Sequence, residues 1–208
     1  MLARARILRQ DLRFLAGLRV LPPRVALFQW RAWRLASRTE DGFSRVSRTE
    51  ARKLALLLSA AHGRQRIVEL GTGTAWTAIS LVLADPRREV LSYDPTRRPE
   101  REQYLRLVSP EARRRLTFVS ASGDEGPRDG GMVGLLYIDS SHHREDTIRE
   151  IEAWRPSLEE GSLVVFDDFG NSEYPGVEEA VRHLGLKGKE RGGLFVHRVS
   201  ALGDGGHA

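Results

Sequence analysis

Three acidic side chains stand where two apolar runs of the chain end. Asp139 closes the run GLLYID, and Asp167 and Asp168 close the run SLVVFDD. If these runs are neighbouring strands of a parallel sheet, ~4.8 Å apart, their carboxylates meet at one edge. Clustered carboxylates repel one another unless they are protonated or bind a cation, and oxygen ligands without cysteine suit Mg²⁺ or another hard divalent cation. The alternative is that these acids only form turns and helix caps.

Two histidines follow the first of these acids. His142 and His143 stand at the predicted start of a helix, whose positive dipole end disfavours an imidazolium. We therefore expect either ring to be neutral near pH 7 and able to accept a proton. A positioned base of this kind contributes ~10²–10⁴-fold to a reaction that removes a proton. The alternative is a solvated or capping histidine.

A glycine loop, ELGTGTAW, follows another apolar run directly. Gly71 and Gly73 allow a tight turn and the close backbone approach that a nucleotide-like ligand needs. A dinucleotide fingerprint requires a third glycine at position 76, where the chain has Trp76, so a hydride-transferring enzyme is disfavoured. Asp94 ends the next strand, about 20 residues on, where an acid binds ribose hydroxyls. The alternative is a turn-forming aspartate before a proline.

Strands and helices alternate from residue 66 onward and must position these groups. Short apolar runs predict strands at RIVEL, EVLSYD, LTFVSA, GLLYID and SLVVFDD, and their near-continuous apolar character indicates a parallel sheet covered on both faces. A helix at about 174–184 and a hairpin over 186–199, turning at Gly192 and Gly193, follow. We predict an α/β fold with a doubly wound, Rossmann-like, mostly parallel seven-stranded sheet and an antiparallel C-terminal hairpin strand.

The N-terminal part is predicted to be helical and basic. Residues 1–40 carry a net charge of +7, whereas the other 168 residues carry −2. An amphipathic helix over 2–19, a second over 24–38 and a third over 47–63, opening at Ser47 or Thr49 and closing on Gly63, are expected. Such helices could contact an anionic membrane or cover a substrate pocket. Alternatively, they pack on the body of the protein or form a homodimer.

The organisation along the chain is predicted as a helical extension over 1–46, a catalytic domain over 47–200 and a disordered tail over 201–208. Cysteine is absent, which excludes disulfides, thiolate metal sites and a cysteine nucleophile. No apolar run approaches the ~20 residues of a membrane span, and we expect a cytoplasmic protein. The basic residues are 30 arginines and three lysines, a bias better explained by genome composition than by nucleic-acid binding.

These motifs together resemble a known family. The segments VELGTGTAWTAISL, VLSYDP, LLYIDSSHHREDTIREIEAW and GSLVVFDDF are similar to the class I S-adenosylmethionine-dependent methyltransferases. More narrowly, they resemble catechol O-methyltransferase-like enzymes and bacterial sugar and small-molecule O-methyltransferases, which carry segments such as EIGTGTGYST, FIDGDHSYEGV and GGVIVFDD. The resemblance covers roughly residues 50–199.

The resemblance implies S-adenosylmethionine as the cofactor and a set of site residues. The residues expected to bind it are Glu69, Gly71, Thr72, Gly73, Asp94, Ser122 and Asp139, with Ser122 near the adenine. A divalent cation would lie on Asp139, Asp167 and Asp168, and His142 with Asp139 would be catalytic. The chain departs from the family at Ala75, where a third glycine is usual, and at Ser141, where an acid is usual.

The function expected from these residues is methyl transfer to a hydroxyl oxygen of a small molecule, with a base or a cation activating the oxygen. Nucleic-acid methylation is a second possibility. It is disfavoured because the fourth strand ends in IDSS rather than in an Asn-Pro-Pro-aromatic loop, and because the carbon-5 pyrimidine route needs a cysteine. A third is a catalytically silent cofactor-binding or membrane-associated protein.

Overall fold

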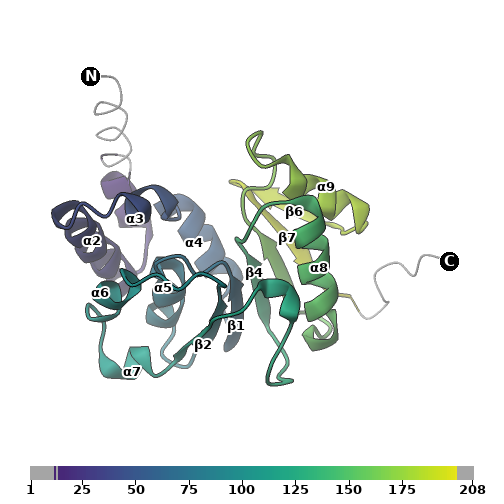
Figure 1. Ribbon diagram of the computed structural model, residues 1–208, viewed down its shortest axis with the longest axis horizontal. Helices are drawn as coiled ribbons and strands as arrows, with labels where there is room; N and C mark the ends of the chain where they lie inside the picture. Colours follow the sequence, from purple (N-terminus) through teal and green to yellow (C-terminus); the bar gives the residue numbers. More distant parts are fainter. Residues whose placement is uncertain (1–11, 13, 201–208) are drawn as a thin grey trace.

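A seven-stranded sheet forms the centre of the molecule (Figure 1). The computed structural model describes residue 12 and residues 14–200. The strand order is β3-β2-β1-β4-β5-β7-β6, in which β1 to β5 are parallel and β7 runs antiparallel to both β5 and β6. The strands are β1 (Arg66–Leu70), β2 (Glu89–Tyr93), β3 (Leu116–Val119), β4 (Leu135–Ile138), β5 (Leu163–Phe166), β6 (Gly188–Arg191) and β7 (Leu194–Arg198). This arrangement confirms the predicted fold class.

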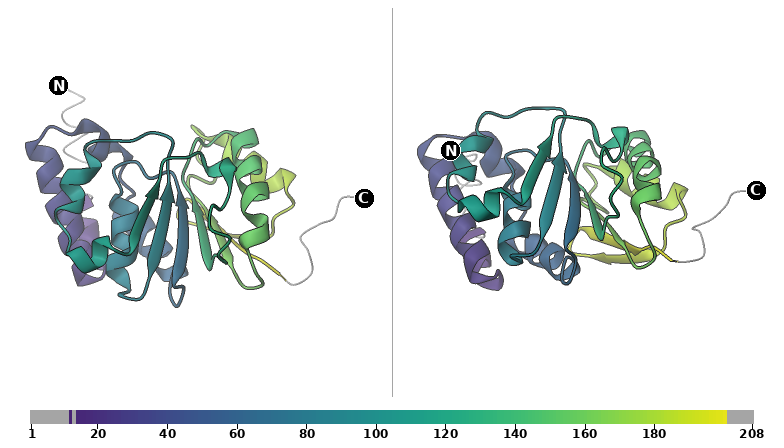
Figure 2. Two further views of the ribbon diagram at one scale, coloured as in Figure 1. Left: turned by 60° about the horizontal axis from the view of Figure 1, so that its bottom comes forward. Right: turned by 90° about the horizontal axis from the view of Figure 1, so that it is seen from below.

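Two layers of helices cover the sheet, one on each face (Figure 2). Alternate strand residues face opposite layers because successive side chains of a strand point to opposite sides. On β1, Ile67 packs with α4 (Ala51–Ala60) and α5 (Trp76–Ala84), whereas Val68 and Leu70 pack with α8 (Arg144–Trp154) and α9 (Pro175–His183). Short helices complete the described part: η1 (Leu18–Val20), α6 (Arg101–Leu105), α7 (Pro110–Arg113), η2 (Gly123–Glu125) and η3 (Arg155–Ser157).

The register of the central strands brings their carboxyl ends to one level. Leu70 of β1 pairs with Ile138 of β4, which in turn pairs with Phe166 of β5. The ladder continues one step further, because the Asp139 N–H donates to the Leu70 carbonyl at 2.8 Å and the Asp167 N–H to the Ile138 carbonyl at 2.9 Å. The residues that follow three different strands therefore start from neighbouring backbone positions.

The N-terminal helices pack on the body in the part of the chain that is described. Helix α2 (Pro23–Arg38) begins beside Pro22 and lies against α5, with Val25, Phe28 and Ala32 fully or almost fully buried. Residues 14–17 are helical, but most of the predicted helix over 2–19, and the predicted tail over 201–208, lie outside the described residues. No described helix is long and apolar enough to cross a membrane. Membrane contact and a homodimer stay predictions.

The predicted helix over 47–63 is wrong at both ends. The structure has instead α3 (Gly42–Ser47), which spans the predicted domain boundary at 46/47, and α4, which starts at Ala51 and ends three residues before Gly63. Asp41 caps α3, and its carboxylate accepts the N–H of Ser44 at 2.9 Å. The Thr49 hydroxyl does not cap α4, because it bonds Thr77 of α5 at 2.9 Å. The hydroxyl group that was predicted to cap the helix therefore makes a tertiary contact instead.

Candidate active site

A cavity of about 650 Å³ opens at the carboxyl ends of β1, β2, β4 and β5. Its volume lies within the ~300–1,000 Å³ range of small-molecule sites. Of the residues predicted from the sequence, those that line it are Gly71, Thr72, Gly73, Asp94, Ser122, Asp139, His142, Asp167 and Asp168. The fold therefore brings nearly the whole predicted set to one hollow. Glu69 is the exception.

The two glycines of the loop have different roles. Gly71 has φ +99°, and a Cβ placed there would lie 1.9 Å from the carbonyl oxygen of Asp139. Gly71 thus serves the close contact between the ends of β1 and β4, and its predicted contact with the cofactor stays a prediction. Gly73 has φ +49°, and the nearest atom to an added Cβ would be a ring carbon of Phe43 at 3.7 Å. Only Gly73 leaves room beside the cavity for a ligand.

The position that lacks the usual third glycine adopts a left-handed conformation. Ala75, with φ +67°, is fully buried at the start of α5. Such a conformation costs a residue with a Cβ roughly 1–2 kcal/mol, which explains why glycine suits this place. Trp76 follows and packs edge-on against Tyr104, with ring centroids 5.2 Å apart. Trp76 is thus a core residue, which fits the exclusion of a dinucleotide site.

Asp94 braces the loop from the end of β2. One carboxylate oxygen accepts the Gly73 N–H at 2.9 Å, and the other accepts the Thr96 N–H at 2.7 Å. Arg101 donates to the Gly73 carbonyl at 3.0 Å and lies 3.9 Å from Asp94. A carboxylate has about four acceptor positions, so two backbone bonds leave Asp94 able to accept from ribose hydroxyls. The turn-forming interpretation of Asp94 is therefore confirmed, and its binding of ribose stays a prediction.

Glu69 lies beneath the loop and not on the cavity wall. Its side chain is 1% exposed and accepts a hydrogen bond from Ser92, whose hydroxyl is 2.6 Å from that of Thr72. Burial raises the pKa of Glu69 to about 8 in spite of the hydrogen bond from Ser92. Its predicted contact with the methionine part of the cofactor stays a prediction.

The three strand-end acids do converge, and a tyrosine joins two of them. The hydroxyl of Tyr137 donates to Asp167 at 3.1 Å and to Asp139 at 3.3 Å. Nε2 of His142 lies 3.3 Å from Asp139 and 3.7 Å from Asp168. His142 and Asp168 are two of the four described non-glycine residues with positive φ. Backbone strain of this kind is concentrated at functional sites.

The pKa values in this cluster are shifted from their ordinary values. Burial raises the pKa of Asp139 to about 7, and the negative charge of Asp167 adds to the rise. Burial lowers the pKa of His142, but the bond to Asp139 and the charges around it outweigh burial and leave the pKa above its ordinary value. This direction is opposite to the one that the helix dipole predicts, and a neutral ring near pH 7 stays a prediction. His142 precedes the helix, whose N-cap is His143, and nearby carboxylates dominate over the dipole.

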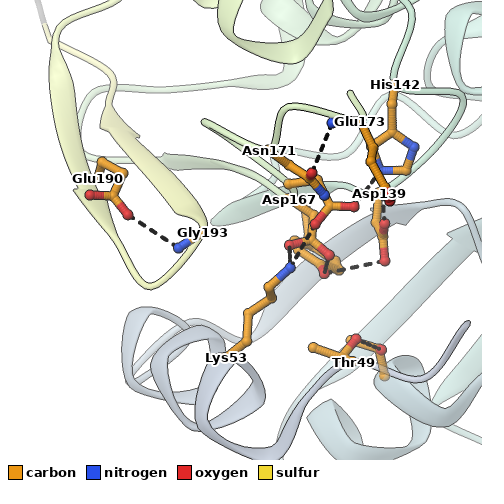
Figure 3. Close-up of polar contacts among 12 residues, drawn as sticks. Thr49, Lys53, Asp139, His142, Asp167, Asn171, Glu173, Glu190 and Gly193 are labelled. Carbon is orange, nitrogen blue, oxygen red and sulfur yellow. Dashed lines mark hydrogen bonds and ion pairs between the residues drawn. The ribbon is translucent and has the colours of Figure 1, made fainter. Parts of the chain in front are cut away.

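A lysine that no motif singled out completes the cluster. Nζ of Lys53, in the first turn of α4, lies 2.7 Å from Oδ1 of Asp167 and 2.9 Å from Oδ1 of Asp168 (Figure 3). The predicted cation site on Asp139, Asp167 and Asp168 does not fit this arrangement, because an ammonium group already lies between two of the ligands. Among the described residues, no group of three or more His, Cys, Asp or Glu could hold a metal ion.

Aromatic side chains border the opening of the cavity. The ring of Tyr174, 40% exposed, stacks on His142 with centroids 4.6 Å apart. Phe43, also 40% exposed, has the guanidinium of Arg98 3.5 Å from its ring centroid. These residues come from segments without a motif, so the sequence offered no signal for them.

The central part of the chain matches a known family. Residues 68–169 match the family described as "Methyltransferase domain". This match includes the last three residues of β1, the whole of β2, β3, β4 and β5, and all three acids of the cluster. No curated protein sequence matches the chain significantly.

Solved structures share the fold at low sequence identity. The chain is similar to CalS11, described as a TDP-rhamnose 3'-O-methyltransferase of calicheamicin biosynthesis, with 21% identity, a TM-score of 0.56, and coverage of 72% of this chain and 77% of that one. It is also similar to a precorrin-6y C5,15-methyltransferase from Geobacter metallireducens, with 19% identity, a TM-score of 0.54, and coverage of 73% and 85%. The printed names of these proteins include both oxygen and carbon as methyl acceptors, so the fold does not identify the acceptor atom.

Proposed function

We propose that this chain is an S-adenosylmethionine-dependent methyltransferase that transfers a methyl group to a hydroxyl oxygen of a small molecule, and the match of residues 68–169 to a methyltransferase domain supports the methyl transfer. One observation carries this proposal. The Gly73 face of the glycine loop and the pair formed by Asp139 and His142 open into the same cavity. A cofactor held on the loop would therefore have a proton acceptor beside it.

The cofactor would be held by the loop and by Asp94, and Ser122 also lines the cavity. When bound, S-adenosylmethionine supplies a methyl group on a sulfonium: the oxygen–carbon bond forms as the carbon–sulfur bond breaks, the electron pair of that bond stays on sulfur, and the hydroxyl proton must leave. Asp139, with a pKa of about 7, matches a general base that works near neutral pH. His142 is 3.3 Å away and shares the proton.

The acceptor would enter between Phe43 and Tyr174, whose exposed rings favour a molecule with an apolar or planar part beside its hydroxyl group. Phenols and catechols fit this opening. Sugar hydroxyls are the other class to include in a test, because an aromatic ring can also contact the apolar face of a sugar.

Calorimetry with S-adenosylhomocysteine tests the cofactor part of the proposal. The wild-type protein should bind this product, and Asp94→Ala should weaken binding by about tenfold or more, since hydrogen bonds to charged groups contribute ~1.5–3 kcal/mol. Asp129→Ala is the matched control, because Asp129 pairs with Arg66 outside the cavity. Absence of binding by the wild-type protein would refute the proposal.

Transfer of labelled methyl to a panel of phenols, catechols and sugars tests the acceptor part. His142→Gln should lower turnover by ~10²–10⁴-fold, the usual contribution of a positioned base. Its affinity for S-adenosylhomocysteine should stay within about twofold of the wild type. His183→Gln, at an exposed position of α9, is the control. Equal turnover by His142→Gln and His183→Gln would show that the pair of His142 and Asp139 does not act as the base.

A further inference from the structure

Lys53 holds the position that a cation would need in this site. Its ammonium bridges the Oδ1 atoms of Asp167 and Asp168 at 2.7 and 2.9 Å. These are direct contacts, so a metal ion could not lie between the same oxygens without displacing the side chain. Figure 3 shows Lys53 reaching from α4 toward Asp167, on the side of the cluster opposite His142.

Every carboxylate oxygen of the cluster has a polar partner from this chain. The two oxygens of Asp167 face Lys53 and the hydroxyl of Tyr137. Those of Asp139 face His142 and Tyr137, and those of Asp168 face Lys53 and, at 3.7 Å, His142. A hard divalent cation needs six or more oxygen ligands in an open arrangement. Here the ammonium of Lys53 lies where such a cation would contact Asp167 and Asp168, and Oδ1 of Asp167 is neutralised by this ion pair alone.

Both the residue type at position 53 and its place in the helix indicate that the carboxylates stabilise its positive charge. Arginine outnumbers lysine 30 to three in this chain, so a lysine is not its default cation. Lysine carries a compact charge that can bridge two carboxylates, whereas the planar fork of arginine pairs with one. A cation in the first turn of a helix is also opposed by the helix dipole. Lys53 is therefore stabilised by the cluster and not by α4.

The ammonium donates a hydrogen bond to Asp168 at 2.9 Å and forms an ion pair with Asp167 at 2.7 Å, which leaves at least one of its three hydrogens for another partner. The side chain of Lys53 is 18% exposed and lines the cavity, and no further partner is seen among the described residues. We propose that Lys53 replaces a divalent cation in this site and donates its remaining N–H to the acceptor oxygen. This inference rests on the proposed function. The positive charge stabilises the oxygen as its proton passes to Asp139 and His142.

Titration with Mn²⁺, followed by electron paramagnetic resonance, tests this inference directly. The wild-type protein should bind Mn²⁺ at the cluster only weakly. Lys53→Met should bind Mn²⁺ at least about tenfold more tightly than the wild type, because an ammonium no longer repels the ion. Adding Asp168→Asn to Lys53→Met should abolish that binding. Lys53→Arg, which keeps the charge, and Lys189→Met, at an exposed position of β6, should behave as the wild type.

Tight Mn²⁺ binding by the wild-type protein that Asp168→Asn removes would overturn the inference, and so would equal affinities in the wild type and Lys53→Met. If Lys53→Met does not fold, the wild type and its Asp168→Asn variant still decide. Calorimetry with S-adenosylhomocysteine on the same samples, with and without EDTA, separates the two proposals. Loss of cofactor binding contradicts the proposed function, whereas tight Mn²⁺ binding by the wild type contradicts only the role of Lys53.

Discussion

The two halves of the cavity are held together by different kinds of contact. At the ends of β1 and β2, Asp94 accepts backbone N–H groups of Gly73 and Thr96, which lie close to it in the fold of one βαβ unit. At the ends of β4 and β5, side chains bind side chains: Lys53 of α4 pairs with Asp167 and Asp168, 114 and 115 positions further along the chain. Hydrogen bonds from the backbone therefore hold the first half, and ion pairs between side chains hold the second half.

The first half therefore depends on backbone geometry, and the second half depends on the ionisation of its side chains. A backbone loop keeps its shape as long as its dihedral angles and close contacts are possible, and protonation changes it little. A charge network depends on the ionisation of each member, since an unpaired buried charge is costly. Substitutions in the first half should therefore act through space and strain, and those in the second half should act in a way that depends on pH.

The largest effect is expected at the contact that joins the two halves. Gly71→Ala would place a Cβ 1.9 Å from the Asp139 carbonyl oxygen, which only a backbone shift can relieve. We expect a loss of about 4 kcal/mol or more in the free energy of unfolding, or no folded protein. Gly73→Ala, whose added Cβ would make only an ordinary van der Waals contact with Phe43 at 3.7 Å, should lose only about 1 kcal/mol. Urea denaturation of both variants measures this, and equal losses would contradict it.

Removal of the lysine should destabilise the second half. Lys53→Met leaves Asp167 and Asp168 without their cation, and breaking a buried pair costs ~3–5 kcal/mol. Because the Lys53 side chain is 18% exposed, we expect about 2–3 kcal/mol at about pH 8. The loss should shrink at about pH 5, because Asp139, whose pKa burial raises to about 7, then binds a proton and the cluster carries one negative charge less. A loss that does not change with pH would show that packing, and not charge, is responsible.

A smaller effect concerns buried acids that have no cationic partner. Burial raises the pKa of Glu69 to about 8 and that of Glu150 to about 7, above their ordinary value of 4.5. At a pH between the ordinary pKa of 4.5 and these raised pKa values, the folded state binds more protons than the unfolded state. The free energy of unfolding should therefore fall as pH rises from about 5 to about 8. Thermal unfolding across this range checks the sign. Glu69→Gln should flatten the curve, and the exposed Glu89→Gln should not.

The smallest effect is expected at Ala75. Ala75→Gly relieves a left-handed conformation worth ~1 kcal/mol but loses the burial of a methyl group worth ~0.8 kcal/mol. The two terms nearly cancel, so the free energy of unfolding should change by less than about 1 kcal/mol. A destabilisation above about 2 kcal/mol in a denaturant titration would mean that the core depends on this methyl group.

The sequence predicted the positions of the glycine loop and of Asp94 well because their signals are local. Strand, glycine loop and terminal acid follow one another along the chain, and their order implies their place at the carboxyl ends of parallel strands. The charges of the other half were predicted only in part. The positions of Asp139, Asp167 and His142 followed from the strand ends, but the ionisation of His142 depends on neighbours that converge only in the fold.

The sequence by itself therefore determined the sheet, its order of strands and helices, and the gathering of glycines and acids at one edge. Apolar runs and turn residues act over a few positions, and a parallel sheet brings their ends together. Only the tertiary structure decided what neutralises the acids, because Lys53 lies in a helix that precedes the whole sheet. It also decided that Gly71 serves the packing of β4 and that Gly73 faces the cavity. Contacts between distant segments have no pattern along the chain.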